Sequence, residues 1–235
     1  MTPNNQHYIR CLEALKDSVL FKNLDTDQLY SILDVATREK WELGTFKNSS
    51  EIHSKIHFVV SGRMKVYQIN SVTDREHTIF ILTSGDIFDI LSLLDNETHD
   101  VYWEVIDTLE ILNIPIGHMR KFIATYLKLN KEILNYIGKR MRNLEDVSSD
   151  VCLHNTLTRL SRLLLKHLNA ESHKLELINN LPNDEIASLI GTTRAVVNRH
   201  IQVLKNCGAI SVKRKQIDVK NLEVLISMAE ERNIV

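Results

Sequence analysis

Two arginines and an asparagine near the C-terminal end of the chain have side chains that can read DNA bases. Arg194, Asn198 and Arg199, together with Thr193, remain exposed if the apolar residues of the same helix are buried. Arginine can pair with guanine through two hydrogen bonds in the major groove, and asparagine and threonine can reach bases or phosphates. These residue types at this spacing predict a helix that enters the major groove.

The residues around this helix have the spacing that two crossed helices require. Ala187 is small enough to let the helices approach closely, and Gly191, four residues on, permits the turn between them. Both helices contribute apolar residues to a shared core: Ile186, Leu189, Ile190, Val197, Ile201 and Leu204. The pattern therefore predicts a helix-turn-helix, against the alternative of an ordinary helical hairpin with a solvated basic turn.

Start and stop signals and a basic wing extend this prediction. Thr192 or Thr193 can cap the second helix, and Gly208 is suited to end it. Two β-type runs, 209–212 and 216–219, flank three consecutive cations that would lie against phosphates. The residues expected to contact DNA are Thr192, Thr193, Arg194, Ala195, Val196, Asn198, Arg199, Lys213, Arg214 and Lys215.

Charge is unevenly distributed along the 235 residues, a length for which two domains are expected. Residues 151–235 carry 12 Lys and Arg against 8 Asp and Glu, whereas residues 1–150 carry 17 against 22. A basic C-terminal part beside an acidic N-terminal part fits one domain that meets nucleic acid and one that does not.

Several classes of protein are disfavoured by what the sequence lacks. Its cysteines, Cys11, Cys152 and Cys207, are far apart and odd in number, which argues against a disulfide framework and a zinc site. There is no secretory leader and no apolar run long enough to span a bilayer, so we expect a soluble cytoplasmic protein without a membrane partner. No grouping of Ser, His and acidic residues suggests catalysis, so we expect no enzyme activity.

The N-terminal part combines helical and β patterns. Residues 6–38 have a helical pattern, in which Asp25 or Thr26 can cap a helix. From Trp41 to Ile116, short β-prone runs alternate with turns, which suggests a small antiparallel barrel or jelly roll. The predicted strands are His57–Val60, Met64–Ile69, Thr78–Leu82, Tyr102–Ile106 and Leu109–Ile114.

From Met119 the pattern is helical again, and a further helix is expected at Thr156–Leu168. Residues 130–149 form a long amphipathic helix, whose apolar stripe includes Ile133, Ile137, Met141 and Leu144. Such a stripe either packs on the chain's own barrel or forms a coiled-coil dimer seam, and its spacing alone allows both.

This order of elements resembles the CRP/FNR family of bacterial transcription regulators over almost the whole chain. Asp184–Val219 is similar to the family's E-x-A-x-x-x-G-x-S/T-R-x-x-V-x-R motif with its following wing. Val59–Val66 is similar to the strand-Gly-strand core, and Gly85–Phe88 to the start of the ligand-cradling turn. Thr158–Leu164 is similar to the segment before the DNA-reading head.

The resemblance implies an α+β fold in three parts. These are a β jelly-roll sensor domain at 1–118, a long dimerisation helix at 119–150 and a winged helix-turn-helix DNA-binding domain at 151–235. It also implies a homodimer on palindromic double-stranded DNA, with RNA polymerase as a further partner if the protein is an activator. The dimer seam would then include Ile133, Ile137, Met141 and Leu144.

The sensor segment departs from the members of the family that bind cyclic AMP. Ile90 stands where those members have a glutamate for the ribose. The phosphate segment, 96–101, has no arginine and contains Glu97 and Asp100, whose charges would repel a phosphate. We therefore predict no cyclic-nucleotide binding and a degenerate effector pocket at Gly85, Asp86, Phe88, Ile90, Leu91, His99, Ser148 and Ser149.

Two other sensor types of the family depend on cysteine or histidine ligands. Three scattered cysteines cannot supply the four ligands of an iron-sulfur cluster. Heme members use an axial histidine where this chain has Leu91, although three other histidines lie nearby: His77, His99 and His118. Cys152 beside His154 could form a redox switch, and protonation of His200 could tune DNA affinity. No cofactor is expected, and heme is kept as an alternative.

The helix that reads DNA also departs from the best-known pattern. Ala195 and Val196 follow Arg194 where many members have Glu and then Thr or Ser, so the contact to cytosine is missing and Val196 could meet a thymine methyl. We predict a homodimeric, site-specific transcription regulator that is independent of cyclic AMP and able to act without a ligand. The alternatives are a heme- or redox-gated regulator, and a small-molecule signalling module that acts through a protein partner.

Overall fold

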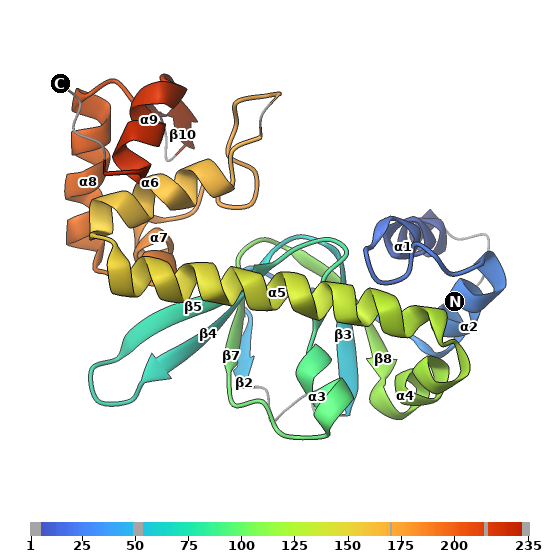
Figure 1. Ribbon diagram of the computed structural model, residues 1–235. Coiled ribbons are helices and arrows are strands. Elements are labelled where there is room, and N and C mark those ends of the chain that lie inside the picture. The colour runs from blue at the N-terminus through green and yellow to red at the C-terminus, as the bar shows by residue number, and fades with distance from the viewer. Residues whose placement is uncertain (1–5, 49–53, 170, 214–215, 232–235) are drawn as a thin grey trace. The chain divides into compact units, whose positions relative to one another are not determined.

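A computed structural model describes residues 6–48, 54–169, 171–213 and 216–231 of the chain (Figure 1). The chain divides into two compact units, one comprising residues 1–75 and 79–141 and the other 76–78 and 142–235. The division falls inside the long helix α5, Lys128–Leu153, rather than at either end of it. The three-part division of the sequence is thus not the division into compact units.

The first unit begins with two helices, α1 (Gln6–Asp17) and α2 (Thr26–Val35). The predicted helix start is confirmed: of the two candidate caps, Asp25 takes the capping position of α2. The Asp25 carboxylate accepts from the Gln28 backbone N–H at 2.9 Å, and the Gln28 side chain accepts from the Asp25 N–H at 3.0 Å. This reciprocal pair satisfies two N–H groups that a helix start leaves without partners.

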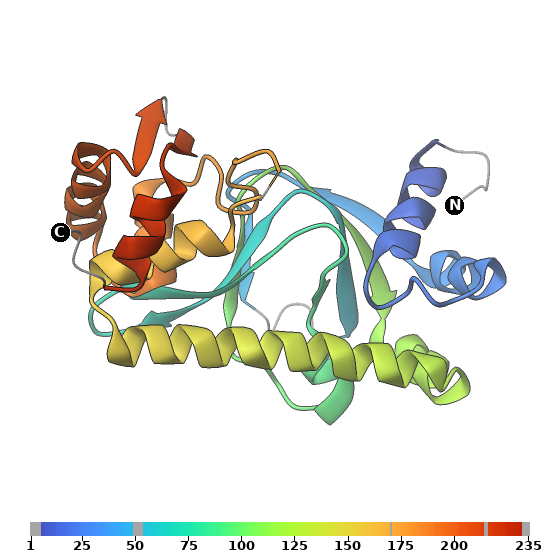
Figure 2. The same cartoon turned by 45° about the horizontal axis from the view of Figure 1, so that its top comes forward.

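Two four-stranded sheets form the body of the first unit (Figure 2). One has the order β1-β8-β3-β6, with bounds Thr37–Trp41, Leu109–Pro115, Lys55–Ser61 and Ile87–Phe88. The other has the order β2-β7-β4-β5, with bounds Phe46–Asn48, Tyr102–Val105, Met64–Asn70 and Arg75–Leu82. The five predicted strands are confirmed, whereas β1, β2 and β6 escaped prediction because two are very short and β1 is mostly polar.

Aromatic residues fill the space between the sheets. Trp103 is fully buried and stacks on Trp41 with ring centroids 4.4 Å apart. A second core lies where the helices of this unit, including α4 (Ile116–Thr125) and the start of α5, pack together. Ile133 of α5 belongs to this second core and is 5% exposed. It is therefore not available to the dimer seam in which the sequence placed it, because its side chain is buried within its own chain.

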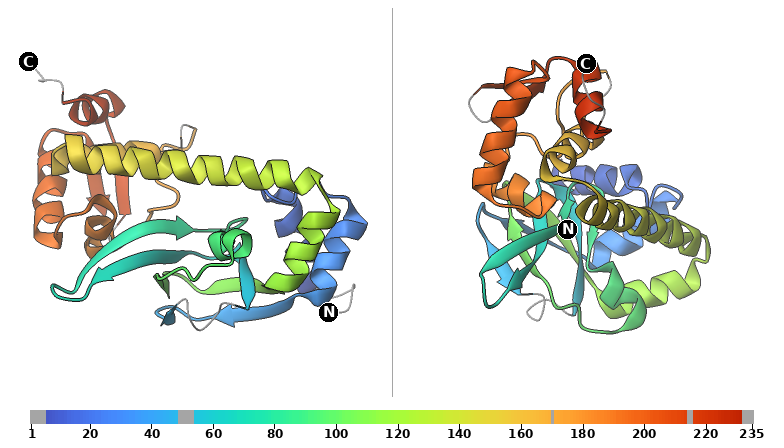
Figure 3. Two further views of the ribbon diagram at one scale, coloured as in Figure 1. Left: turned by 60° about the horizontal axis from the view of Figure 1, so that its bottom comes forward. Right: turned by 60° about the vertical axis from the view of Figure 1, so that its left-hand side comes forward.

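The second unit is a small helical domain with a two-stranded sheet (Figure 3). Its elements are α6 (Thr156–Lys166), α7 (Asn183–Ile190), α8 (Arg194–Asn206), β9 (Ile210–Lys213), β10 (Gln216–Val219) and α9 (Leu222–Ala229). The helix α9, which was not predicted, packs along α6. The predicted α+β class, with an N-terminal β domain and a C-terminal winged helix-turn-helix, is confirmed.

Candidate nucleic-acid interface and sensor site

The turn between α7 and α8 is built on the glycine that the sequence provides. Gly191 ends α7 with a φ of +68°, a conformation that costs other residues free energy. Ala187 is 3% exposed at the contact between the helices, and its carbonyl accepts from the Thr192 N–H at 2.9 Å. Of the two predicted caps, Thr193 occupies the capping position of α8, and its side chain makes no capping hydrogen bond.

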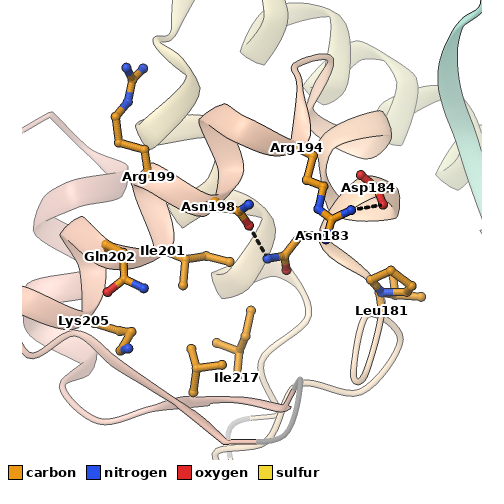
Figure 4. Close-up of a pocket in the computed structure, with 12 residues that line it drawn as sticks. Leu181, Asn183, Asp184, Arg194, Asn198, Arg199, Ile201, Gln202, Lys205 and Ile217 are labelled. Carbon is orange, nitrogen blue, oxygen red and sulfur yellow. Dashed lines mark hydrogen bonds and ion pairs between the residues drawn. The ribbon is translucent and has the colours of Figure 1, made fainter.

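The outer face of α8 presents the polar residues that the sequence singled out. Arg194, Asn198 and Arg199 are exposed, whereas Val197 of the same helix is completely buried. The first turn of α7 contacts this face: Asn183 Nδ2 donates to Asn198 Oδ1 at 2.6 Å, and Arg194 lies 3.4 Å from the Asp184 carboxylate (Figure 4). The amide oxygen of Asn198 thus has a partner on α7 in this structure.

A groove of about 870 Å³ runs between α8, the first turn of α7 and the two-stranded sheet (Figure 4). Its lining contains two polar residues that sequence reasoning missed, Gln202 and Lys205. Both are exposed and continue the helical spacing of Arg194 and Asn198, which is the signal that could have identified them. A basic and amide-rich groove of this kind offers donors for base edges and phosphates.

The wing is present as the antiparallel pair of β9 and β10, in which Lys213 is paired with Gln216. Lys213 is exposed at the end of β9. The predicted contacts Arg214 and Lys215 lie outside the described residues. Ala195 is exposed and Val196 is half-buried on the first turn of α8, so this turn has no carboxylate to accept a hydrogen bond from cytosine.

In the first unit, the turn that resembles a ligand cradle is occupied by the chain's own side chains. Gly85 has a φ of +87°, and the carboxylate of Asp86 accepts from the Thr83 N–H at 3.0 Å. The other oxygen of that carboxylate accepts from Arg140 Nη2 at 2.5 Å and from the Tyr136 hydroxyl at 3.2 Å. Burial raises the pKa of Tyr136, and the neighbouring Asp86 charge raises it further, so this phenol stays protonated and donates.

The other residues of the predicted effector pocket differ in burial and in the unit to which they belong. Phe88 is buried between two imidazoles, with ring centroids 6.3 Å from His57 and 6.4 Å from His99. Ile90 and Leu91 begin the short helix α3 (Ile90–Asp95), where Ile90 is half-buried and Leu91 is 45% exposed. Ser148 and Ser149 are exposed and belong to the second unit.

His99 forms an ion pair that ties its loop to the start of α3. Its Nδ1 lies 3.1 Å from Asp89 Oδ1, and the same carboxylate accepts from the Ser92 hydroxyl at 2.6 Å. Hydrogen bonding to Asp89 raises the pKa of His99 against the opposing effect of burial. Burial also works against the ionised form of Asp89, yet the hydrogen bonds from His99 and Ser92 hold the pKa of that carboxyl below its usual value.

The buried His57 was not expected to matter from the sequence. It is 2% exposed, and its Nδ1 lies 2.6 Å from Asn113 Oδ1. With Trp41, Trp103 and Phe88 it belongs to the packed rings between the two sheets.

The remaining candidate groups of the sequence are the cysteines and His200. Cys152 is exposed, and burial raises the pKa of the Cys11 thiol to about 11, which keeps it unreactive. His200 Nε2 lies 2.7 Å from the Thr156 hydroxyl, and burial, aided by Arg199, lowers the pKa of this histidine. Among the described residues, no cluster of three or more His, Cys, Asp and Glu could hold a metal ion, and no helix has the length and apolarity to cross a membrane.

Comparisons with known proteins match both units. A cyclic nucleotide-binding domain family matches residues 48–126, and a Crp-like helix-turn-helix domain family matches residues 158–228. The "CRP-like cAMP-activated global transcriptional regulator" of Mycobacterium tuberculosis is 22% identical over 179 residues, which cover 74% of this chain and 80% of the relative. The "Fumarate and nitrate reduction regulatory protein" of Yersinia pestis is 24% identical over 211 residues, 87% of this chain and 82% of the relative.

Solved structures share the fold at low identity. A CooA mutant from Carboxydothermus hydrogenoformans has a TM-score of 0.74 at 22% identity, covering 92% of this chain and 97% of the other. The c-di-GMP responsive global regulator CLP of Xanthomonas campestris has a TM-score of 0.71 at 17% identity, covering 84% and 100%. These likenesses agree with the two-unit fold.

Replacing His99 should reveal the pH dependence of its ion pair. Because the pKa of His99 is raised in the folded state, the pair stabilises the fold fully below the ordinary pKa of 6.5 and loses this effect as pH rises through the folded pKa. His99→Asn should lower the free energy of unfolding by roughly 1 kcal/mol at about pH 5.5 and by much less at about pH 8.5, measured by urea unfolding. The exposed His173→Asn serves as the control. A deficit that stays constant or grows with pH would contradict this role.

Proposed function

Because the chain belongs to the CRP/FNR family of transcription regulators, we propose that it binds a specific palindromic DNA site as a homodimer, without needing a cyclic nucleotide. The observation that carries the proposal is the exposed polar face of α8, which stands beside a groove and above a fully buried core residue, Val197. At the level of the family, this is a transcription regulator rather than an enzyme.

Three residues are proposed to read the half-site. Arg194 and Arg199 carry the donor forks that guanine or phosphate accepts, and Asn198 has the amide that pairs with adenine. The ion pair of Arg194 with Asp184 is exposed at both partners and therefore weak, so a guanine can replace the carboxylate. The hydrogen bond from Asn183 to Asn198 orders the reading amide in advance, which lowers the entropy lost on binding.

Backbone contacts are proposed for the cations that flank the groove. Lys205 lines the groove and Lys213 is exposed on β9, where both can meet phosphates on either side of α8. Gln202 lies on the groove face between Asn198 and Lys205 and can serve either a base or a phosphate. Affinity should therefore fall steeply with salt concentration.

The dimer is proposed to form along an exposed apolar stripe of α5. Leu134, Met141, Leu144 and Val151 are 70%, 61%, 41% and 41% exposed. They repeat at intervals of seven and three residues, as the a and d positions of a coiled coil do. Of the residues that the sequence predicted for the dimer seam, Met141 and Leu144 remain in this proposal. Ile137 is partly packed on the core of its own chain, and the exposed Leu134 replaces the buried Ile133.

Independence from cyclic nucleotides is proposed from the charges of the cradle. Asp86 already accepts from Arg140 and Tyr136 of α5, so this helix is tied to the turn without a ligand between them. Arg120, a nearby cation, donates to the carbonyls of Ser92 and Leu93 and is thereby engaged by α3. In the described part of the cradle both arginines are thus already hydrogen-bonded, so either would have to give up these bonds to hold a cyclic phosphate.

The alternatives have weaker support. For heme, Leu91 stands at the position of the axial histidine, and an absorbance scan of the purified protein tests for the cofactor directly. A module that signals only through a protein partner would have no use for the basic groove along α8. Arg194→Ala with wild-type DNA affinity would favour that alternative.

Removing the reading amide should relax specificity at one base pair. A preferred palindrome is first selected from a randomised duplex pool with the wild-type protein. Asn198→Ala should then weaken binding to it by roughly 5- to 100-fold and erase the preference at one position of each half-site, because a bidentate contact is lost. Gln68→Ala, which removes an exposed amide of the first unit, is the matched control. Unchanged preference at every position would contradict a reading role for Asn198.

Placing a charge on the apolar stripe should separate the dimer. Met141→Glu is expected to shift the mass in solution from dimer to monomer at micromolar concentration, because paired carboxylates would be buried in the seam. The fold itself should be unaffected, since Met141 is exposed within its own chain. Leu127→Glu, at a residue that is 72% exposed but precedes α5, should leave the mass unchanged. Sedimentation velocity measures both, and an intact Met141→Glu dimer would rule out this seam.

Cyclic nucleotides should have no effect on the protein. Adding about 1 mM cyclic AMP or cyclic GMP should leave Tm unchanged and alter DNA affinity by less than about twofold, because binding to the folded state would raise Tm. The cAMP-activated relative from Mycobacterium tuberculosis is the positive control. A clear rise in Tm or a large gain in DNA affinity would show that the cradle binds a nucleotide despite its charges.

A further inference from the structure

The guanidinium of Arg159 joins three backbone segments of the second unit. Its Nη2 donates to the Val151 carbonyl at 2.8 Å and its Nε to the His154 carbonyl at 2.9 Å. Its Nη1 donates to the Ile190 carbonyl at 3.2 Å. Arg159 lies on α6, Val151 on the last turn of α5, His154 just after that helix, and Ile190 at the end of α7.

These carbonyls are the ones that need a partner. The last four carbonyls of a helix accept no hydrogen bond from an N–H of the same helix, and they carry the negative end of its dipole. Val151 and Ile190 are in the last turns of α5 and α7, so one cation satisfies the ends of two helices. Arginine can do this because its planar fork has five N–H groups, whereas a lysine ammonium offers a single point of contact.

The turn of the helix-turn-helix lies against the same junction. A Cβ on Gly191 would lie 3.7 Å from Arg159 Nη1 and 3.8 Å from Val151 Cγ2. The helix α8 begins three residues later, at Arg194, and is tied again to the start of α6 through His200 and Thr156 at 2.7 Å. The direction of α8 relative to the end of α5 is therefore determined at this junction.

We propose that Arg159 is a positioning residue for DNA recognition, which sets the direction of α8 relative to the end of α5. This role rests on the proposed function, in which α5 carries the dimer seam and α8 enters the major groove. In such a dimer, a change of angle at the junction moves the two α8 helices relative to each other. It alters the preferred distance between half-sites and leaves the reading of each half-site unchanged.

The test uses full-length Arg159→Lys and Arg159→Gln. Each is titrated against the selected palindrome, against versions whose spacer is one base pair longer or shorter, and against an isolated half-site. Loss of the fixed junction should weaken binding to the preferred palindrome roughly tenfold and reduce the discrimination between spacers, because α8 is no longer held in one direction. Binding to the isolated half-site should change by less than about twofold.

Arg162→Gln is the matched control. Arg162 lies three residues along α6 and pairs with Asp150 at 2.7 Å, but its side chain is 41% exposed and this pair does not involve α7. It should keep the wild-type preference for one spacer. Thermal unfolding of each variant shows that the comparison is made between folded proteins.

Two results would overturn the role of Arg159. Variants that keep wild-type affinity and spacer preference would show that the junction does not depend on this guanidinium. An equal loss on the palindrome and on the half-site would show that Arg159 only stabilises the second unit. In both cases the wild-type protein still binds its site, so the proposed function stands; absence of specific binding by the wild-type protein would overturn that function and this role together.

Discussion

The close crossing of α7 and α8 is the constraint on which the surface of the second unit depends. Val197 and Leu204 are completely buried, and each residue along a helix turns the side chain by about 100°. With these two directed inward, Arg199, which lies about 200° around the helix from Val197, must be directed outward, whatever it contacts there. Truncating a buried leucine costs about 2–5 kcal/mol, whereas an exposed ion pair such as Arg194 with Asp184 contributes about 1 kcal/mol or less. The reading face is therefore held by the core beneath it.

The first unit keeps the scaffold of a ligand-binding domain but changes its chemistry. The tight turn at Gly85 remains, and the short strand β6 pairs with β3 as it leaves that turn. An anion would need donors and positive potential here, yet the turn presents the Asp86 carboxylate. That charge is balanced from inside the chain by Arg140, with both side chains about one-fifth exposed. A partly buried pair of this kind contributes more to a defined position of α5 on the turn than to net stability.

The sequence predicted what depends on local spacing. Gly191 and Ala187 are recognisable because a tight helical turn and a close helix contact each restrict the residue type, and the longer strands alternate visibly. The contacts of Asp86 with Arg140 join residues 54 positions apart, so no local sequence pattern predicts them. Arg159 was recognised only as part of a family-like segment, because its role depends on three carbonyls rather than on neighbouring side chains. The strands β2 and β6 are too short to show a period.

The long helix shows why an apolar stripe could not be assigned from spacing alone. Ile133, Tyr136 and Arg140 face the first unit, at steps of three and four residues. Leu134, Met141 and Leu144 follow at steps of seven and three and are exposed. The two stripes are offset by a single residue, which is about 100° around the helix. The spacing of apolar residues in the sequence therefore does not distinguish one stripe from the other. The burial of Ile133 in the core of its own chain identifies the face of α5 that packs on the first unit. The exposed stripe on the neighbouring face is the one proposed to form the dimer.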